Sequence, residues 1–355
     1  MKSRNQFLGA AVAAALLAAG NPGHAQDKGV EVKLSGQINR AILNADDGTD
    51  NKWFNTDNGN STTRFRFNAE GDAGRGLRAG ILFEVEYPSN SSGAVSMGTR
   101  EVSPTLNERH MDAFVRGGFG TVRLGQGDGA ANGASEVDLS GTTVAHYSSS
   151  PDVGGAFTYR SGSAFTGAKI SDSISNQDFE SRYDRVLYQS PNFNGFMAET
   201  SWGNKDTNIG ELALRYSGKL DGLGTLAGAI GYSNENGVAG AKDDRTVGGS
   251  VSWLHGSGLN LTFTHTTRDL PGRDGKFDYL KLGYKTGDHA VSVDYGIGKD
   301  QAMSGDDAKV YGIGYVFTPV AWWEVFALLK QHSLDRPGTN YDDVRFFMVG
   351  SRIKF

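Results

Sequence analysis

The chain has 355 residues, a formal net charge of −5 and no cysteine. The absence of cysteine excludes a disulfide framework and thiolate metal sites. Glycine accounts for 50 residues, about twice its average usage. Because glycine weakens helices and suits turns, bulges and barrel corners, this composition disfavours a helical enzyme.

The N-terminus differs in composition from the rest of the chain. Two bases precede a continuous apolar run from Phe7 to Ala19, and small residues lead up to Ala25. This is the pattern of a secretory signal peptide. A membrane anchor would need about 20 apolar residues, and this run is shorter. We therefore expect residues 1–25 to be a signal peptide cleaved near Ala25, and residues 26–355 to form one domain.

Beyond the N-terminus, apolar residues recur with a period of two, which is typical of strands with one apolar and one wet face. The alternation is sharpest where Arg64 and Arg66 interleave with Phe65 and Phe67. No helical period is sustained. The expected strands cover residues 30–38, 62–70, 77–87, 107–116, 121–127, 182–189, 196–203, 210–219, 225–234, 245–255, 259–268, 277–285, 290–299, 309–318, 322–333 and 342–355.

These strands are joined alternately by short turns and long polar loops. The long loops are expected at residues 44–61, 88–106, 128–181, 235–244, 269–276, 300–308 and 334–341. A closed up-and-down barrel hides the edges of all its strands, and many of these strands match the roughly 9–11 residues that cross a bilayer at a tilt. The sequence therefore predicts an all-β fold, a 16-stranded antiparallel transmembrane β-barrel.

The charges decide which face of each strand meets lipid. A lysine or arginine facing lipid near the bilayer midplane costs about 2–4 kcal/mol, so Arg64 and Arg66 are expected in the lumen and Phe65 against lipid. Aromatic residues near strand ends suit the two membrane interfaces. The same alternation assigns Arg78, Glu84, Glu108, Asp112, Arg123, Arg185, Glu199 and Arg215 to the lumen.

The longest connection, Asp128–Ser181, is called the insert below. It is far longer than a usual loop of about 4–6 residues, and it carries seven acids and two bases. Acids that face a basic wall across a narrow aqueous gap create a transverse field that disfavours apolar solutes. The expected pore constriction has Glu136, Asp138 and Asp128 on the loop side and Arg64, Arg66, Arg123 and Arg78 on the wall side. The part of the insert up to Arg160 is expected to narrow the pore, and the charge count predicts a weak preference for cations.

Three segments carry a resemblance to a known family. The final strand, VRFFMVGSRIKF, ends on Phe355 and is similar to the terminal strand of bacterial outer-membrane barrels, where a final phenylalanine is recognised during assembly. Residues 107–127 resemble the fourth hairpin of the Gram-negative general diffusion porins, and residues 185–196 resemble the strand and turn after their third loop. The resemblance covers the whole chain after the signal peptide.

The resemblance implies a homotrimer of sixteen-stranded barrels, each with an inward-folded third loop. It also implies a location in the outer membrane, among lipid and lipopolysaccharide, and recognition of Phe355 by the barrel assembly machinery. Ions and small hydrophilic solutes would diffuse through a water-filled pore. No cofactor, metal site or nucleic-acid partner is expected.

Two alternatives remain open on the sequence. One is a substrate-selective channel, specific for a sugar or an anion. The other is an outer-membrane enzyme, which would need a nucleophile, a base and an acid within hydrogen-bond reach. His110 and Asp112 share the predicted lumen face, and the insert adds His146 and several serines. No catalytic residue is assigned, because lumen histidines are usually solvated side chains.

Overall fold

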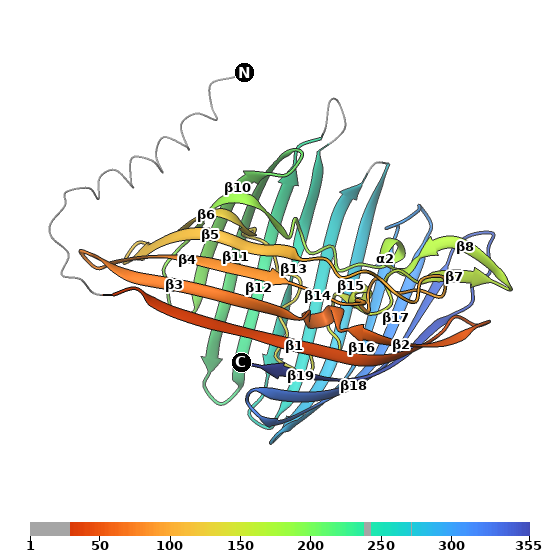
Figure 1. Ribbon diagram of the computed structural model, residues 1–355. Helices are drawn as coiled ribbons and strands as arrows, with labels where there is room; N and C mark the ends of the chain where they lie inside the picture. The colour runs from red at the N-terminus through yellow and green to blue at the C-terminus, as the bar shows by residue number, and fades with distance from the viewer. Residues whose placement is uncertain (1–28, 238–242, 271) are drawn as a thin grey trace.

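The structure is a computed structural model that describes residues 29–237, 243–270 and 272–355. The expected signal peptide and its cleavage site lie outside the described residues. All neighbouring wall strands pair antiparallel, and β1 pairs with β19, so the sheet closes on itself as a barrel (Figure 1). The predicted 16-stranded barrel is therefore confirmed.

The strands of the barrel sheet are β1 (Glu31–Asp46), β2 (Asn51–Asp57), β3 (Arg64–Gly74), β4 (Leu77–Glu86), β5 (Asn107–Gly117), β6 (Gly120–Asp128), β9 (Arg182–Gln189), β10 (Phe196–Asn204), β11 (Asn208–Leu220), β12 (Gly224–Glu235), β13 (Asp244–Leu254), β14 (Leu259–Leu270), β15 (Arg273–Thr286), β16 (His289–Lys299), β17 (Asp307–Val320), β18 (Trp323–Asp335) and β19 (Val344–Lys354). Outside this sheet lie the hairpin of β7 (Thr158–Ser161) and β8 (Ala164–Lys169), the short α2 (Ile170–Ser173), η1 (Gly59–Ser61) and η2 (Ser150–Asp152). Within the described ranges, no helix is long and apolar enough to cross a membrane.

The second wall strand is split into β2 and β3, which both pair with β1 and are separated by η1. The prediction of a loop over residues 44–61 is therefore wrong for most of these residues, which lie in β1, β2 and η1. The side chain of Asp47 explains the tight turn, because its Oδ1 accepts the backbone N–H groups of Thr49 and Asp50. Gly48 in the same turn has a φ of 87°, which glycine adopts without strain.

A second expected loop is also shorter than predicted. Residues 269–276 lie mostly in strands, because β14 continues to Leu270 and β15 begins at Arg273. The alternation of short turns and long loops between successive strands is thus less strict than the sequence predicts. The β4–β5 connection and the insert remain the two longest excursions from the wall.

The outer face of the wall is apolar, as the alternation predicts. On β13, for example, Val251 is 42% exposed, whereas its neighbours Ser250 and Ser252 are buried on the inner face. The inner face of β15–β19 is not simply polar, however. Phe277, Tyr279, Phe326, Leu328, Phe346 and Met348 point inward and are buried.

These inward-facing apolar residues pack against apolar residues of the insert. Phe157 of the insert lies edge-on to Phe346 of β19 at 5.1 Å between ring centroids, and to Phe54 of β2 at 5.8 Å. The insert contributes Val144, Ala145, Val153, Phe157, Tyr159, Ile170 and Ile174 to this cluster. Each fully buried large apolar side chain is worth about 1.5–3 kcal/mol, so an apolar core fixes this part of the insert to one side of the barrel.

Candidate functional site: the insert and the basic wall

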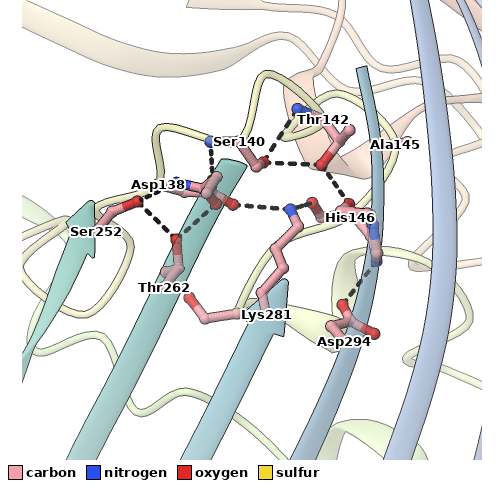
Figure 2. Close-up of polar contacts among 12 residues, drawn as sticks. Asp138, Ser140, Thr142, Ala145, His146, Ser252, Thr262, Lys281 and Asp294 are labelled. Carbon is pink, nitrogen blue, oxygen red and sulfur yellow. Dashed lines mark hydrogen bonds and ion pairs between the residues drawn. The ribbon is translucent and has the colours of Figure 1, made fainter. Parts of the chain in front are cut away.

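Polar contacts fix the early part of the insert to the wall, and their centre is a buried ion pair. Lys281 of β15 places its Nζ 2.7 Å from Asp138 Oδ2 and 2.7 Å from the carbonyl oxygen of His146 (Figure 2). The two charged side chains are 0% and 3% exposed. Asp138 is therefore a contact between insert and wall rather than a residue facing open space, and its expected place in the constriction does not fit this burial.

His146 makes a second buried contact on the neighbouring strand. Its Nδ1 lies 2.6 Å from Asp294 Oδ2, and its Nε2 lies 2.7 Å from Ser292 Oγ. Both partners belong to β16. The order of atoms is that of a Ser–His–Asp triad, but all three residues are buried, and the Ser292 hydroxyl also contacts Thr142 at 2.6 Å. The group links the insert to the wall.

Small hydroxyl residues of the wall satisfy the backbone of the insert. The N–H groups of Val137 and Leu139 donate to the hydroxyls of Ser250 and Ser252 on β13, at 2.8 and 2.9 Å. Lys330 of β18 donates to the carbonyl oxygen of Ser150. Buried backbone groups need such partners, and the wall supplies them at successive inward-facing positions. We call the polar contacts of Asp138, His146 and these backbone groups the tether.

The later part of the insert lies at the rim. Arg160 of β7 is buried and pairs with Asp47 at 2.6 Å and with Asp50 at 2.5 Å, both in the β1–β2 turn. Its guanidinium also lies over the ring of Phe165. The hairpin β7–β8 is thus fixed to the first turn of the barrel, so Arg160 marks the rim-side limit of the segment that faces the wall.

A cavity of about 900 Å³ separates the insert from the opposite side of the barrel. Arg64 of β3, Arg109 of β5 and Arg182 of β9 line it as bases. Its acids are Glu86 of β4 and Glu136, Asp152 and Asp178 of the insert. The structure therefore brings together two of the predicted constriction residues, Glu136 and Arg64.

The three carboxyl groups that the insert presents to this cavity are hard to ionise. Burial raises the pKa of Asp152 to about 6, against the effect of the Tyr147 hydroxyl, which donates to it at 2.6 Å. Burial also raises the pKa of Glu136 well above its usual value, and the nearby Asp178 and Asp152 add to this shift. The pKa of Asp178 is likewise raised by burial. The negative charge on the loop side is weaker than a count of acids indicates.

Two smaller cavities, of about 380 and 340 Å³, continue along the same side of the barrel. The first shares Asn132 with the large cavity, and the two smaller ones share Arg66, Leu82, Arg123 and Gln189. Of the predicted constriction residues, Arg66 and Arg123 line both of the smaller cavities. Asp128 lines the cavity of about 380 Å³ and pairs with Arg182 at 2.8 Å. Arg78 lines none of the three and pairs with Glu70.

At two places along these cavities an arginine is clearly more exposed than the acid that it pairs with. Glu84 is only 2% exposed and contacts both Arg66 and Arg109 at 2.6 Å. Arg66 itself is 45% exposed. Asp112 is buried in the same way between Arg123 at 3.2 Å and Arg185 at 2.7 Å. We call the surface along these cavities the basic wall, and at these two places a solute meets the guanidinium groups of Arg66 and Arg123 before the acids.

Arg109 was not predicted, and a β-bulge explains why. The pairing of β4 with β5 shifts between Glu84, opposite His110, and Val85, opposite Glu108, so Arg109 is the extra residue. A bulge reverses the alternation of a strand on one side of it. Arg109 consequently faces inward, and Glu108, which the alternation assigned to the lumen, is exposed on the outside.

Phe355 completes the closure of the barrel. Its N–H donates to the carbonyl oxygen of Gly36 at 3.0 Å, and its own carbonyl oxygen accepts from the Gly36 N–H at 2.9 Å. Phe355 as a whole is 64% exposed. Its recognition during assembly stays a prediction.

The sequence matches the family model of the Gram-negative porins over residues 10–318. This chain belongs to the Gram-negative porin family. No relative was found among curated proteins. Porins are outer-membrane channels, so this porin forms a β-barrel channel through which solutes diffuse.

Solved porin structures share the fold at low sequence identity. The anion-selective porin from Comamonas acidovorans is 20% identical, with a TM-score of 0.65 over 92% of this chain and 100% of that chain. OmpF of Salmonella typhi, in complex with daunomycin, is 13% identical, with a TM-score of 0.62 over 93% and 99%. The trimer form of Vibrio cholerae OmpT is 13% identical, with a TM-score of 0.56 over 92% and 99%.

Proposed function

We propose that this porin is a general diffusion channel whose insert folds into the lumen and constricts the pore at the large cavity. The observation that carries the proposal is the arrangement of charge there. Arg64, Arg109 and Arg182 of the wall line this cavity, and Asp152 of the insert, whose pKa is raised only to about 6, adds a negative charge at neutral pH. Opposed charges across a water-filled gap orient water and hinder apolar solutes, whereas small hydrophilic solutes pass.

We further propose that the pore prefers anions, in contrast to the preference expected from the charge count. Of the acids on the insert, Asp138 and Asp128 are paired with bases, and burial raises the pKa of Glu136 and of Asp152. The two smaller cavities together are lined by six bases and four acids. The anion-selective porin among the structural neighbours has the same fold, which is consistent with this proposal.

Reversal potentials across a salt gradient test the preference. The purified protein in a planar bilayer should give the potential of an anion-preferring pore, and Glu136→Gln should change it little, because that carboxyl already ionises weakly. Arg66→Gln should shift the potential towards cations, since it removes an exposed charge. A cation-preferring wild-type potential, or an equally large shift for the Glu136 variant, would contradict the proposal.

A substrate-selective channel is the alternative function. A sugar-specific pore would need aromatic rings along the path, but the inward-facing aromatic residues of β15–β19 are buried beneath the insert. We infer that the chain is not an enzyme, because His146 and its partners Ser292 and Asp294 are buried. A saturable block of conductance by a sugar would favour the alternative.

We propose that the protein assembles as a homotrimer through the outer face of β1 and β2. Arg40 lies between the exposed Ile38 and Ile42 on the outer face of β1 and donates to Asn55 Oδ1 and to the Ser89 carbonyl oxygen. An arginine facing lipid at this depth would cost about 2–4 kcal/mol, so contact with protein is favoured. Semi-native electrophoresis should show a trimer band, and Arg40→Leu should weaken it.

The remaining partners follow from the outer-membrane location. We propose that the signal peptide is cleaved near Ala25, that lipid and lipopolysaccharide surround the barrel, and that the barrel assembly machinery reads Phe355. The exposure of Phe355 supports the last point. Mass spectrometry of the mature protein should place its N-terminus at Gln26, and Phe355→Ser should reduce its insertion into the outer membrane.

A further inference from the structure

We propose that the smallest of these three cavities, of about 340 Å³, is a binding subsite for organic anions that combine a carboxylate with an apolar group. It lies on the basic wall towards the short-turn end of the barrel, away from the constriction. This inference rests on the proposed channel function. The volume is within the range of about 300–1,000 Å³ that is typical of small-molecule sites.

Positive charge dominates the cavity. Lys33 of β1, Arg66 of β3, Arg116 of β5 and Arg123 of β6 line it, and Glu70 is its one acid. The three arginines each contact an acid, namely Glu84, Glu70 and Asp112. Glu84 and Asp112 do not line the cavity. Their carboxylates therefore contact Arg66 and Arg123 from outside the cavity, and guanidinium N–H groups on the cavity side can bind a ligand.

Lys33 supplies the fourth positive charge of the cavity. It is exposed on β1, opposite Asn68 of β3. No ion pair or side-chain hydrogen bond of Lys33 occurs among the described residues, in contrast to the arginines around it. An ammonium group free to move beside three fixed guanidinium groups is suited to contact a carboxylate that enters the cavity.

The floor of the cavity is apolar, which a purely ionic wall would not need. Leu82 and Phe114 line it, and they are the two apolar side chains at inward-facing positions of the described strands β3–β6. Gly80 lies opposite Phe114, and a Cβ there would approach the ring to 2.6 Å. The glycine thus lets the ring lie against the wall, with the Arg123 guanidinium over it at 5.0 Å.

The positive charges and the apolar residues of the cavity together determine which class of ligand it can bind. Inorganic anions would use the charges but gain nothing from Leu82 and Phe114, and neutral apolar solutes would not offset the desolvation of the arginines. A small aromatic carboxylate can place its acidic group among the cations and its ring on the apolar floor. Neighbouring Ser35, Thr121 and Gln189 add hydrogen-bonding groups for orientation.

Single-channel recordings in KCl test the subsite, with benzoate, acetate, phosphate and benzamide as probes. Benzoate should interrupt the current at a concentration at least about fivefold below that of acetate or phosphate, as expected for roughly 40 Å² of buried apolar surface. Benzamide should have little effect. Equal block by benzoate, acetate and phosphate would overturn the inference, because the cavity would then recognise charge alone.

Variants separate the two elements of the site. Lys33→Met should weaken the benzoate block about fivefold, the scale of one exposed charge contact, and Leu82→Asn should weaken the block by benzoate but not by acetate. Lys299→Met, a change on the outer face of β16, is the matched control and should change neither. An unaltered block in the Lys33 variant would refute the subsite. Absence of any KCl conductance in the wild type would instead refute the channel.

Discussion

Replacement of Lys281 by methionine tests whether the tether holds the early insert against the wall. The change removes the base of a fully buried ion pair and leaves Asp138 without its 2.7 Å partner. Loss of one member of such a pair costs about 3–5 kcal/mol. The wall pairing of β15 depends on backbone groups and is untouched.

The cost can be compared with three neighbouring hydrogen bonds between the insert and hydroxyl groups of the wall. Val137, Leu139 and Thr142 each make one hydrogen bond to a wall hydroxyl. At about 0.5–1.5 kcal/mol each, these bonds together contribute about 1.5–4.5 kcal/mol. The free-energy cost of leaving Asp138 buried without its partner is about as large as the contribution of these three hydrogen bonds. We therefore expect the segment around Asp138 to leave the wall, while the apolar core still holds Phe157 in place.

Single-channel recordings should show this release as a noisier open-channel current with additional conductance levels. The double variant Asp138→Leu and Lys281→Met removes both charges and should return the current towards the wild-type pattern. Lys285→Met is the matched control, because Lys285 lies on the same strand and is exposed. A quiet, wild-type current from a correctly folded Lys281→Met variant would refute the role of the tether.

Four further outcomes are expected. Lowering the pH from about 7.5 to about 5 should increase anion preference. The pKa of Asp152 is raised to about 6, so its carboxyl group loses its negative charge as the pH falls through that value. Reversal potentials measure this shift, and the shift should be smaller in the Asp152→Asn variant than in the wild type. Arg109→Gln should shift selectivity towards cations by roughly twofold, whereas Glu108→Gln should not, and a reversed order would place the β-bulge elsewhere. Gly154→Ala should loosen the insert and increase its cleavage in limited proteolysis, because the new Cβ would meet Phe346 at 2.2 Å and a φ of 86° costs about 1–2 kcal/mol for alanine; Gly162→Ala, which has open space, is its control. Deletion of Glu136–Ser150 should raise conductance while the barrel still assembles, and an unchanged conductance would show that this segment does not narrow the pore.

Strand alternation predicted the wall of the barrel well, because lipid imposes a large penalty on a misplaced charge. The assignment of Arg66 to the lumen and Phe65 to the outside follows from that penalty alone, and both lie as expected. The rule fails at Arg109, where one extra residue reverses the alternation. No feature of the local sequence marks that bulge, since its pairing partner lies on another strand.

The insert was harder to predict, because its contacts are with distant strands. The acid content of the insert alone predicts Asp138 in the constriction, whereas in the structure Asp138 is buried in an ion pair with Lys281 of the wall. The apolar residues of the insert do not stand out in the sequence among its many glycines and serines. One signal was present in the sequence. Phe346 and Met348 are apolar at lumen positions of β19, and such residues need a partner inside the barrel.

The position of these contacts along the chain bears on biogenesis. Lys330 reaches back 180 residues to Ser150, and Phe346 of the last strand meets Phe157 of the insert. The insert is therefore synthesised long before its partners, and such distant contacts form late in folding. The same strand, β19, closes the barrel against β1 and contacts the insert. We expect the insert to pack against the wall and the barrel to close in one step, so that an intermediate with an open barrel exposes the insert to periplasmic proteases.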